Sequence, residues 1–324
     1  MKNHKVSIII PVYNIADYLE KCVQSCIEQT SRDIEIIIIN DGSTDYSSAI
    51  IEKLAEQDKR IIFVDKKNEG VSLARKTGFD TSSGDFVFYL DGDDWIESDA
   101  IEKLYNKAVE SEADIVFGNY FVVTNNEKKA YDCLINTSAL DRIAIQHFMI
   151  DNYSFRIWGN LYKRQLHTNL FYPPINPSIG EDAIQVLQMV NKSSKIDIVK
   201  DNLYNYVIRE TSIMNTNSNR SLKEYDCSIA IDQMLKHVCF ETSVHNKLIC
   251  LALEKLCIYI SEFGDLGKEK KWAKDFLTAN YFQSKSHRQM TYKKNKKVYT
   301  MLLLACISPK LVQKLSSLNK ILKV

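Results

Sequence analysis

The sequence predicts an α/β fold in which a mostly parallel central sheet is followed by a helical C-terminal region. Two observations carry this prediction. Up to about residue 123, short apolar runs alternate with amphipathic stretches at helical spacing, which is the pattern of successive strand–helix–strand units. From about residue 221 onward, only the helical spacing remains. We therefore predict two domains, residues 1–220 and residues 221–324.

The first part of the chain supplies the strands and helices of the sheet. Its apolar runs are rich in β-branched residues, as expected for strands that are buried on both faces. The segments between these runs place their apolar side chains on one helical stripe, and Thr44 or Asp45 can cap the second helix. The predicted strands span 6–12, 34–39, 61–64, 86–90 and 114–123, and the predicted helices span 16–29, about 45–57, 71–79 and 98–111.

The stretch 86–95, FVFYLDGDDW, carries the clearest chemical signal. An apolar strand runs directly into Asp91, Asp93 and Asp94, at the edge where open α/β sheets bind ligands. Carboxylate oxygens suit Mg²⁺ or Mn²⁺, and such a cation usually takes substrate phosphates as further ligands. Taken alone, an exposed Asp/Gly turn that closes a strand is an equally good interpretation.

Beyond residue 125 the alternation weakens. Three prolines mark an irregular loop that leads to Glu181 and Asp182 at the start of a helix. Acidic residues are common in a first helical turn because they interact favourably with the helix dipole, so capping alone explains them equally well. The remaining predicted elements are helices at 140–150 and 183–190 and short strands at 196–199 and 204–208.

Composition excludes several classes of protein. The formal net charge is +1, which indicates no nucleic-acid partner. Eight cysteines occur without a CxxC pair, which favours buried thiols in a reducing cytosol over a disulfide framework. Residues 1–5 lead straight into a strand, so we expect no signal peptide. The apolar run 301–307 is too short to span a bilayer.

Six segments of the chain occur in a characteristic order: SIIIPVYN, IINDGSTD, NEGVSLARKTG, LDGDDW, WGNLYKR and GED. Together they resemble the family 2 glycosyltransferases, inverting enzymes with the Rossmann-like GT-A fold, over about residues 5–215. The resemblance is greatest to bacterial enzymes that build capsular or exopolysaccharide repeat units or decorate wall polymers. One departure is Asn160, where lysine is more usual, and this puts an acceptor role for the position in doubt.

The resemblance implies a role for each matching residue. Asp93 would hold a Mn²⁺ or Mg²⁺ ion that bridges the diphosphate of a nucleotide sugar, and Asp182 would be the catalytic base. The implied donor-binding residues are Pro11, Val12 and Tyr13 around the nucleotide base, Asp41 hydrogen-bonded to it, Asn68 and Arg75 at the nucleoside, Asp91 at the ribose, and Arg209 at the diphosphate or the acceptor. Outside the family context, Asp41 is better explained as a turn residue and Arg75 as a solvated helix charge.

The implied reaction transfers a sugar, by default from a uridine diphosphate donor, to a saccharide or lipid-linked saccharide. Two alternatives remain open at this stage. A haloacid-dehalogenase-type phosphatase or phosphotransferase also places two aspartates after a strand, but Trp95 stands where that motif has Thr or Val. The second alternative is a non-catalytic nucleotide-sugar-binding subunit.

The end of the chain has the pattern of an interfacial helix. In residues 309–324, PKLVQKLSSLNKILKV, leucines recur at helical spacing and lysines flank them. A helix packed on the catalytic domain explains the pattern about equally well. Because many relatives extend lipid-linked acceptors, we predict a cytoplasmic protein that attaches peripherally to the anionic inner face of the cell membrane, with no spanning segment.

Overall fold

The structure is a computed structural model, and it describes residues 5–124, 127–131, 141–173, 180–209, 220–263, 266 and 270–282. Within the described residues the chain forms two compact units. The first draws on Met1–Phe148, Phe155–Leu170 and Gln185–Asn215, and the second on Met149–Ser154, Phe171–Ile184 and Thr216–Val324. The predicted domain boundary at residue 220 stays a prediction, although two short segments from earlier in the chain group with the second unit.

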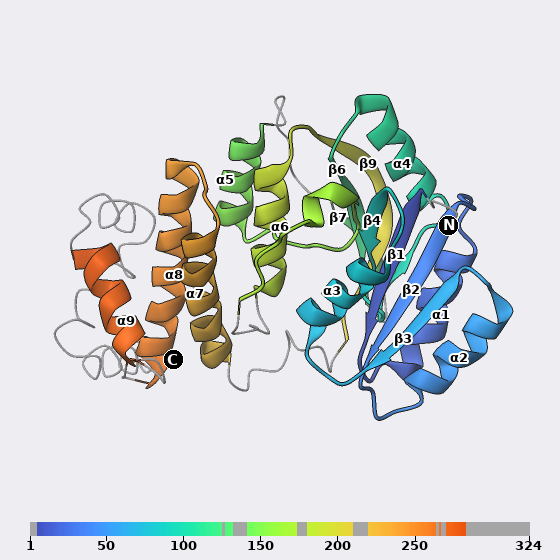
Figure 1. The fold of residues 1–324 in the computed structure, drawn as a ribbon, viewed down its shortest axis with the longest axis horizontal. Helices are drawn as coiled ribbons and strands as arrows, with labels where there is room; N and C mark the ends of the chain where they lie inside the picture. Colours follow the sequence, from blue (N-terminus) through green and yellow to red (C-terminus); the bar gives the residue numbers. More distant parts are fainter. Residues whose placement is uncertain are drawn as a thin grey trace. The chain divides into compact units, whose positions relative to one another are not determined.

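The first unit is built on one curled sheet (Figure 1). Its first four strands pair in parallel, because each is followed by a connection that returns to the same end of the sheet. In spatial order these strands are β3 (Ile61–Lys66), β2 (Ile34–Asp41), β1 (Val6–Val12) and β4 (Phe86–Tyr89).

The sheet continues beyond β4 through strands that come later in the chain. Here antiparallel pairs join the two parallel parts, so the sheet is mixed at this side. In spatial order these strands are β8 (Asn160–Lys163), β6 (Ile115–Val123), β9 (Ile196–Val207) and β5 (Trp95–Ile96), with β7 (Lys128–Tyr131) also paired to β6. The predicted α/β fold with a mostly parallel central sheet is confirmed.

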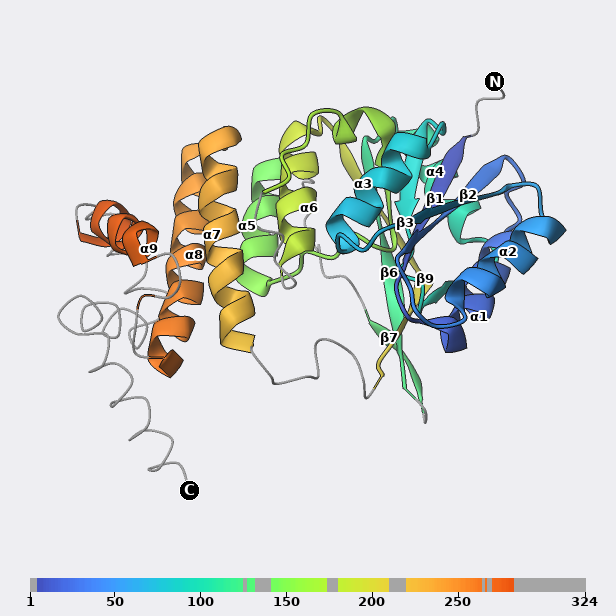
Figure 2. The ribbon, with the colours of Figure 1, turned by 60° about the horizontal axis from the view of Figure 1, so that its bottom comes forward.

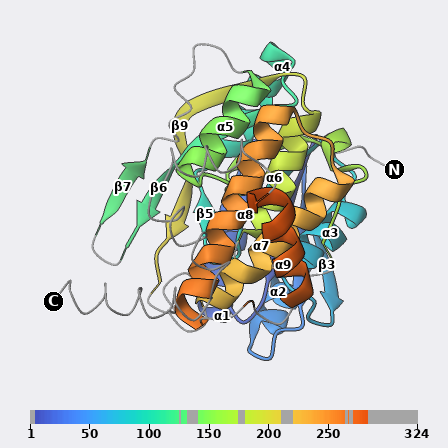
Figure 3. The same ribbon diagram turned by 90° about the vertical axis from the view of Figure 1, so that its left-hand side faces the viewer.

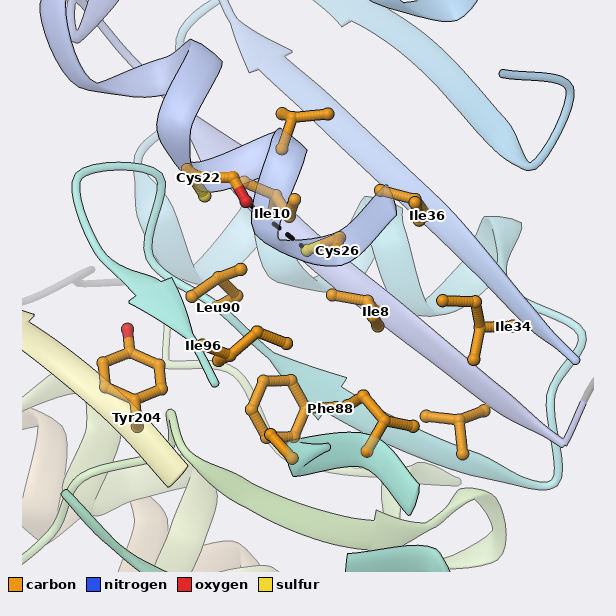
Figure 4. Close-up of a cluster of buried hydrophobic side chains, with 14 of the residues drawn as sticks. Ile8, Ile10, Cys22, Cys26, Ile34, Ile36, Phe88, Leu90, Ile96 and Tyr204 are labelled. Carbon is orange, nitrogen blue, oxygen red and sulfur yellow. Dashed lines mark hydrogen bonds between the residues drawn. The ribbon is translucent and has the colours of Figure 1, made fainter. Parts of the chain in front are cut away.

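Helices cover both faces of the parallel strands. The side chains of Ile8 and Ile10 on β1 pack with the buried thiols of Cys22 and Cys26, as Figure 4 shows. Removing such side chains from water stabilises the fold by roughly 1.5–3 kcal/mol each. Helices α1 (Ala16–Ile27), α2 (Ser47–Gln57) and α4 (Ala100–Ser111) supply this core, while α3 (Val71–Thr81) lies on the face opposite α1 and α2 (Figure 2).

The later part of the chain is helical, as predicted. Helices α7 (Arg220–His237) and α8 (Thr242–Phe263) pack side by side along their lengths (Figure 3). The indole N–H of Trp272, on α9 (Lys270–Leu277), donates a hydrogen bond to Asp232 on α7. The remaining helical segments are α5 (Arg142–Asn152), a 3-10 turn Arg164–His167, α6 (Glu181–Lys192), α9 (Lys270–Leu277) and a π-helical turn Thr278–Phe282. The predicted interfacial helix, 309–324, lies outside the described residues.

The prediction of two short strands at 196–199 and 204–208 is wrong. They form the single strand β9, which pairs in parallel with β6. The polar residues Lys200 and Asp201, which interrupt the apolar pattern, are exposed at a shift in register, where the side-chain amide of Asn119 donates to the carbonyl of Lys200. A register irregularity of this kind lets a strand pass through polar residues without ending.

The buried histidine His167 makes the stability of the fold dependent on pH. Its ring stacks on Phe79 with ring centroids 4.9 Å apart, and only 4% of the residue is exposed. Burial, helped by the charges of Arg164 and Lys192, lowers the pKa of His167 from 6.5 to about 3. In the unfolded chain this imidazole takes up a proton below about pH 6.5, whereas in the folded chain it stays neutral until about pH 3.

We therefore expect His167 to reduce stability as the pH falls. Between about pH 6 and pH 3, protonation of this group stabilises the unfolded chain and lowers the free energy of unfolding by about 1.4 kcal/mol per pH unit. The variant His167→Phe removes the titration and keeps a ring against Phe79, so its free energy of unfolding should change less between pH 7 and pH 5, by about 2 kcal/mol. Denaturant unfolding at the two pH values measures this. If the free energy of unfolding changed equally in variant and wild type, the imidazole of His167 would take up its proton as readily in the folded chain as in the unfolded one.

Candidate active site

Parallel strands bring polar residues from distant parts of the sequence to one edge of the sheet. Val12 at the end of β1 lies beside Asn40 at the end of β2, and the N–H of Leu90 after β4 donates to the carbonyl of Ile9. The segments that follow β1, β2 and β4 therefore leave the sheet at the same edge, which is where ligands bind in open α/β sheets. Tyr13, Asp41 and Asp91 all occupy this edge.

Asp41 shapes the loop that precedes α3. Its side chain is buried, and its two carboxylate oxygens accept hydrogen bonds from the backbone N–H groups of Glu69 (3.0 Å) and Gly70 (2.8 Å). The ammonium of Lys66 lies 3.1 Å from the same carboxylate. Asn68, exposed on this loop, is therefore positioned by Asp41. The predicted contact of Asp41 with a nucleotide base stays a prediction.

Asp91, the first of the three acids, is held by Arg75. The guanidinium lies 2.9 Å from a carboxylate oxygen of Asp91, and the arginine side chain is 3% exposed, against 27% for the aspartate. A buried arginine is costly unless it is paired with a carboxylate, so the pair fixes both side chains. The sequence left open whether Arg75 is a solvated helix charge, and the structure shows that it is buried at the site.

Asp93 is paired with Arg209, which follows β9. The guanidinium of Arg209 contacts a carboxylate oxygen of Asp93 and also lies over the ring of Tyr18, 5.1 Å from its centroid. Burial and the neighbouring charge of Asp91 raise the pKa of Asp93, and Arg209 opposes them. Asp91 and Asp93 therefore each carry an arginine partner at the same edge of the sheet.

Asp94 plays a different part from the other two acids. It is 2% exposed, and it accepts hydrogen bonds from the hydroxyl of Tyr204 (2.6 Å) and the backbone N–H of Val207 (2.7 Å). Burial, followed by the charges of Asp93 and Asp91, raises the pKa of Asp94. No sequence pattern predicts this hydrogen bond, because Tyr204 lies 110 residues further along the chain.

The turn that carries the acids lies close against the end of β1. A Cβ atom at Gly92 would lie 2.3 Å from the Cδ1 atom of Ile15 and 3.2 Å from the carbonyl oxygen of Pro11. The φ angle of Gly92 is not in the left-handed region, so glycine is needed here for close approach and not for an unusual turn conformation. A larger residue would have to displace the end of the Ile15 side chain and would crowd the carbonyl of Pro11.

The other predicted residues are placed as follows. Pro11 and Val12 are buried at the end of β1, whereas Tyr13 is 51% exposed. Asp182 lies in the first turn of α6 and belongs to the second unit, while all other predicted site residues belong to the first. Asn160 is buried, and its amide bonds the carbonyl of Arg156 and the N–H of Gly118, which makes it structural.

The acids suit a hard cation only if a ligand supplies the remaining oxygens. Among the described residues, no group of three or more His, Cys, Asp and Glu side chains is placed to hold a metal ion. Mg²⁺ is often bound by only one or two carboxylates together with substrate phosphates, and Asp91 and Asp93 are both partly exposed at the edge. These two residues therefore fit a cation that arrives with a diphosphate. None of the helices that the structure describes is both long enough and apolar enough to cross a membrane.

Comparison with known proteins finds glycosyltransferase relatives of this chain. The family model for glycosyl transferase family 2 matches residues 7–171. The glycosyltransferase GlyA of Streptococcus pneumoniae is 37% identical over 219 residues, which are 64% of this chain and 31% of GlyA. The minor teichoic acid biosynthesis protein GgaB of Bacillus subtilis is 30% identical over 215 residues, which are 64% of this chain and 23% of GgaB. The chain thus matches less than a third of the length of either relative.

The fold has a close counterpart among solved structures. The crystal structure of Staphylococcus aureus TarS 1-349 superposes with a TM-score of 0.69 at 16% sequence identity, covering 96% of this chain and 90% of that one. The complex of the same fragment with UDP-GlcNAc gives a TM-score of 0.67 at 17% identity and the same coverage. This likeness confirms the predicted GT-A fold. Since the family model spans more than half of the sequence, the chain belongs to glycosyl transferase family 2.

Proposed function

We propose that this chain transfers a sugar from a UDP-sugar to a saccharide or lipid-linked saccharide, with inversion, in the synthesis of a bacterial surface polysaccharide. The observation that carries the proposal is the pair Asp91 and Asp93 after β4, each with its own arginine. Two carboxylates and two guanidinium groups at one sheet edge match the hydroxyls, phosphates and counter-cation of a nucleoside diphosphate. The UDP-GlcNAc bound by TarS and the teichoic acid pathway of GgaB support the donor and acceptor classes.

Each residue at this edge of the sheet would bind a different part of the nucleotide-sugar donor. Tyr13, exposed after β1, and the loop held by Asp41 would receive the nucleotide base. Asp91, held in place by Arg75, would accept hydrogen bonds from the ribose. Arg209 would turn from Asp93 to the diphosphate, because a guanidinium binds phosphate oxygens in the same bidentate way as it binds a carboxylate.

Asp93 would hold Mn²⁺ or Mg²⁺ when the diphosphate is present. The cation would offset the negative charge that develops on the departing diphosphate. Arg209 already lies against Asp93, so the chain itself also brings a positive charge to this position. The two arginine partners also offset part of the repulsion between Asp91 and Asp93 before any ligand binds.

Asp182 would act as the base. Its carboxylate would take the proton of the acceptor hydroxyl while the hydroxyl oxygen bonds to the anomeric carbon of the sugar. The bond from that carbon to the diphosphate oxygen breaks on the opposite face, and the diphosphate leaves with the electron pair. The first turn of a helix favours the ionised form of a carboxylate, which keeps Asp182 ready to accept a proton. This single displacement inverts the anomeric centre.

Incubation of the purified chain with labelled UDP-sugars, Mn²⁺ and saccharide acceptors tests the proposal. Labelled sugar on the acceptor together with free UDP supports it. Membership of glycosyl transferase family 2 removes the haloacid-dehalogenase alternative, in which Asp91 would be a nucleophile. UDP-sugar binding with no turnover on any acceptor would instead indicate the non-catalytic binding subunit.

We also propose that the basic tail, 309–324, attaches the protein peripherally to the inner face of the cell membrane. The support is its sequence, in which lysines flank a stripe of leucines. Each lysine near an anionic leaflet contributes about 1 kcal/mol, and salt weakens this attraction. The whole chain should sediment with anionic liposomes at low salt, whereas a chain that ends near residue 285 should not. Equal behaviour of both chains would favour a tail packed on the protein.

A further inference from the structure

The hydroxyl of Tyr204 bridges both ends of the turn that carries the three acids. It donates a hydrogen bond to the Asp94 carboxylate (2.6 Å) and accepts one from the backbone N–H of Asp91 (3.1 Å). The turn is closed from within by the N–H of Asp94, which donates to the carbonyl of Asp91 at 3.0 Å. One oxygen atom from β9 thus fixes the first and last residues of a four-residue turn.

The ring of Tyr204 has little freedom to move. The residue is fully buried, and its ring stacks on Trp158 with centroids 4.4 Å apart and planes 22° apart. Gly159 adopts a φ of +71°, and a Cβ atom there would lie 3.3 Å from Cβ and Cγ of Tyr204. Figure 4 shows the ring on β9 near Leu90, which follows β4, and near Ile96 on β5. The packing therefore holds the hydroxyl in one place.

The segment that follows Tyr204 is tied to the same turn at two further points. The backbone N–H of Val207 donates to the second carboxylate oxygen of Asp94 at 2.7 Å. Two residues later, Arg209 pairs with Asp93. The segment from Tyr204, near the end of β9, to Arg209, just beyond it, thus contacts Asp91, Asp94 and Asp93.

We infer that Tyr204 and Asp94 form a clamp that positions Asp91 and Asp93 for the donor. Asp94 is fully engaged by Tyr204 and Val207, so it acts on the ligand through the turn and not by contact. Because Arg209 follows β9 directly, the clamp sets the acids and the arginine relative to each other. The protein groups that bind the nucleotide sugar must be placed to within a fraction of an ångström. A loosened turn therefore weakens binding even when the fold is intact. This inference rests on the proposed function.

The test compares Tyr204→Phe with Tyr162→Phe. Tyr162 is also fully buried in the sheet, and its hydroxyl accepts a hydrogen bond from the amide of Asn160, away from the acids. Both variants lose one buried hydroxyl, but Tyr204→Phe breaks two hydrogen bonds, one of them to a carboxylate, so it should lose more thermal stability than Tyr162→Phe. Calorimetric titration with UDP and Mn²⁺ should show about 10-fold weaker binding for Tyr204→Phe only. In the transfer assay, Tyr204→Phe should mainly raise KM for the donor.

Hydrogen–deuterium exchange without ligand provides a readout that does not depend on the proposed function. Tyr204→Phe should speed exchange in the peptide that covers residues 90–95, and Tyr162→Phe should not. Equal exchange in the two variants, or unchanged UDP binding by Tyr204→Phe, would show that Tyr204 is only a core residue and would overturn the clamp. A wild type that binds no UDP would overturn the proposed function instead, and the exchange comparison would still decide the clamp.

Discussion

Asp93→Asn should abolish metal-dependent sugar transfer, with a loss of roughly 10³-fold or more in kcat/KM. The substitution keeps the shape of the side chain and removes the negative charge that would hold the cation and that pairs with Arg209. Lewis-acid stabilisation of a leaving diphosphate is worth several kcal/mol, and about 4 kcal/mol corresponds to roughly 10³-fold. Transfer assays at saturating Mn²⁺, together with titration of UDP in the presence and absence of Mn²⁺, measure both effects.

The matched control for this experiment is Asp80→Asn. Asp80 is a partly exposed aspartate on α3 that pairs with Lys76 on the same helix, so its loss removes one surface charge away from the acid turn. It should leave transfer unchanged, and both variants should melt within a few degrees of the wild type. Full transfer by the wild type in EDTA would rule out a metal held by Asp93 and leave Arg209 as the source of positive charge.

Asp182→Asn should reduce turnover by roughly 10²-fold or more while donor affinity stays within a few-fold of the wild type. The amide keeps the size of the carboxylate but cannot accept the proton of the acceptor hydroxyl. Asp182 lies in the first turn of α6, where a neutral polar residue is also tolerated, so the helix should form normally. Steady-state kinetics with varied donor and acceptor separates kcat from KM.

Glu181→Gln is the matched control for the base. Glu181 is the neighbouring acid in the same helical turn, so the variant has the same effect on the helix dipole. It should retain most of the activity. Near-normal turnover by Asp182→Asn with a large loss in Glu181→Gln would transfer the role of base to Glu181. A large loss in both would indicate that the negative charge of the turn matters more than either carboxylate.

The sequence predicted the elements that are determined by their own residues. The apolar runs that became β1, β2 and β3 are rich in β-branched residues, and the run that became β4 is rich in aromatic ones, as expected for strands of a buried parallel sheet. The short strands β5, β7 and β8 are not predicted by the sequence, since they are defined by pairing with neighbouring strands and not by a pattern of their own. The same reason explains why β9 was divided in two.

The position of the acids was predictable because the carboxyl ends of parallel strands meet at one edge of the sheet. Asp91 and Asp93 were placed at the ligand-binding edge because an apolar run precedes them, and the structure shows them there. The bond between Tyr204 and Asp94 was not predictable, because it joins positions that only the completed sheet brings together. For Asp41, the sequence could not show that its oxygens are taken by the loop before α3.

The two arginine–aspartate pairs have a consequence for the speed of donor capture. A sheet edge that bears free carboxylates would repel an incoming nucleotide, and the encounter would speed up as salt screened that repulsion. With Asp91 and Asp93 each matched by a guanidinium, the local charges of the four side chains cancel before any ligand arrives. The association rate constant for a UDP-sugar should therefore depend only weakly on ionic strength.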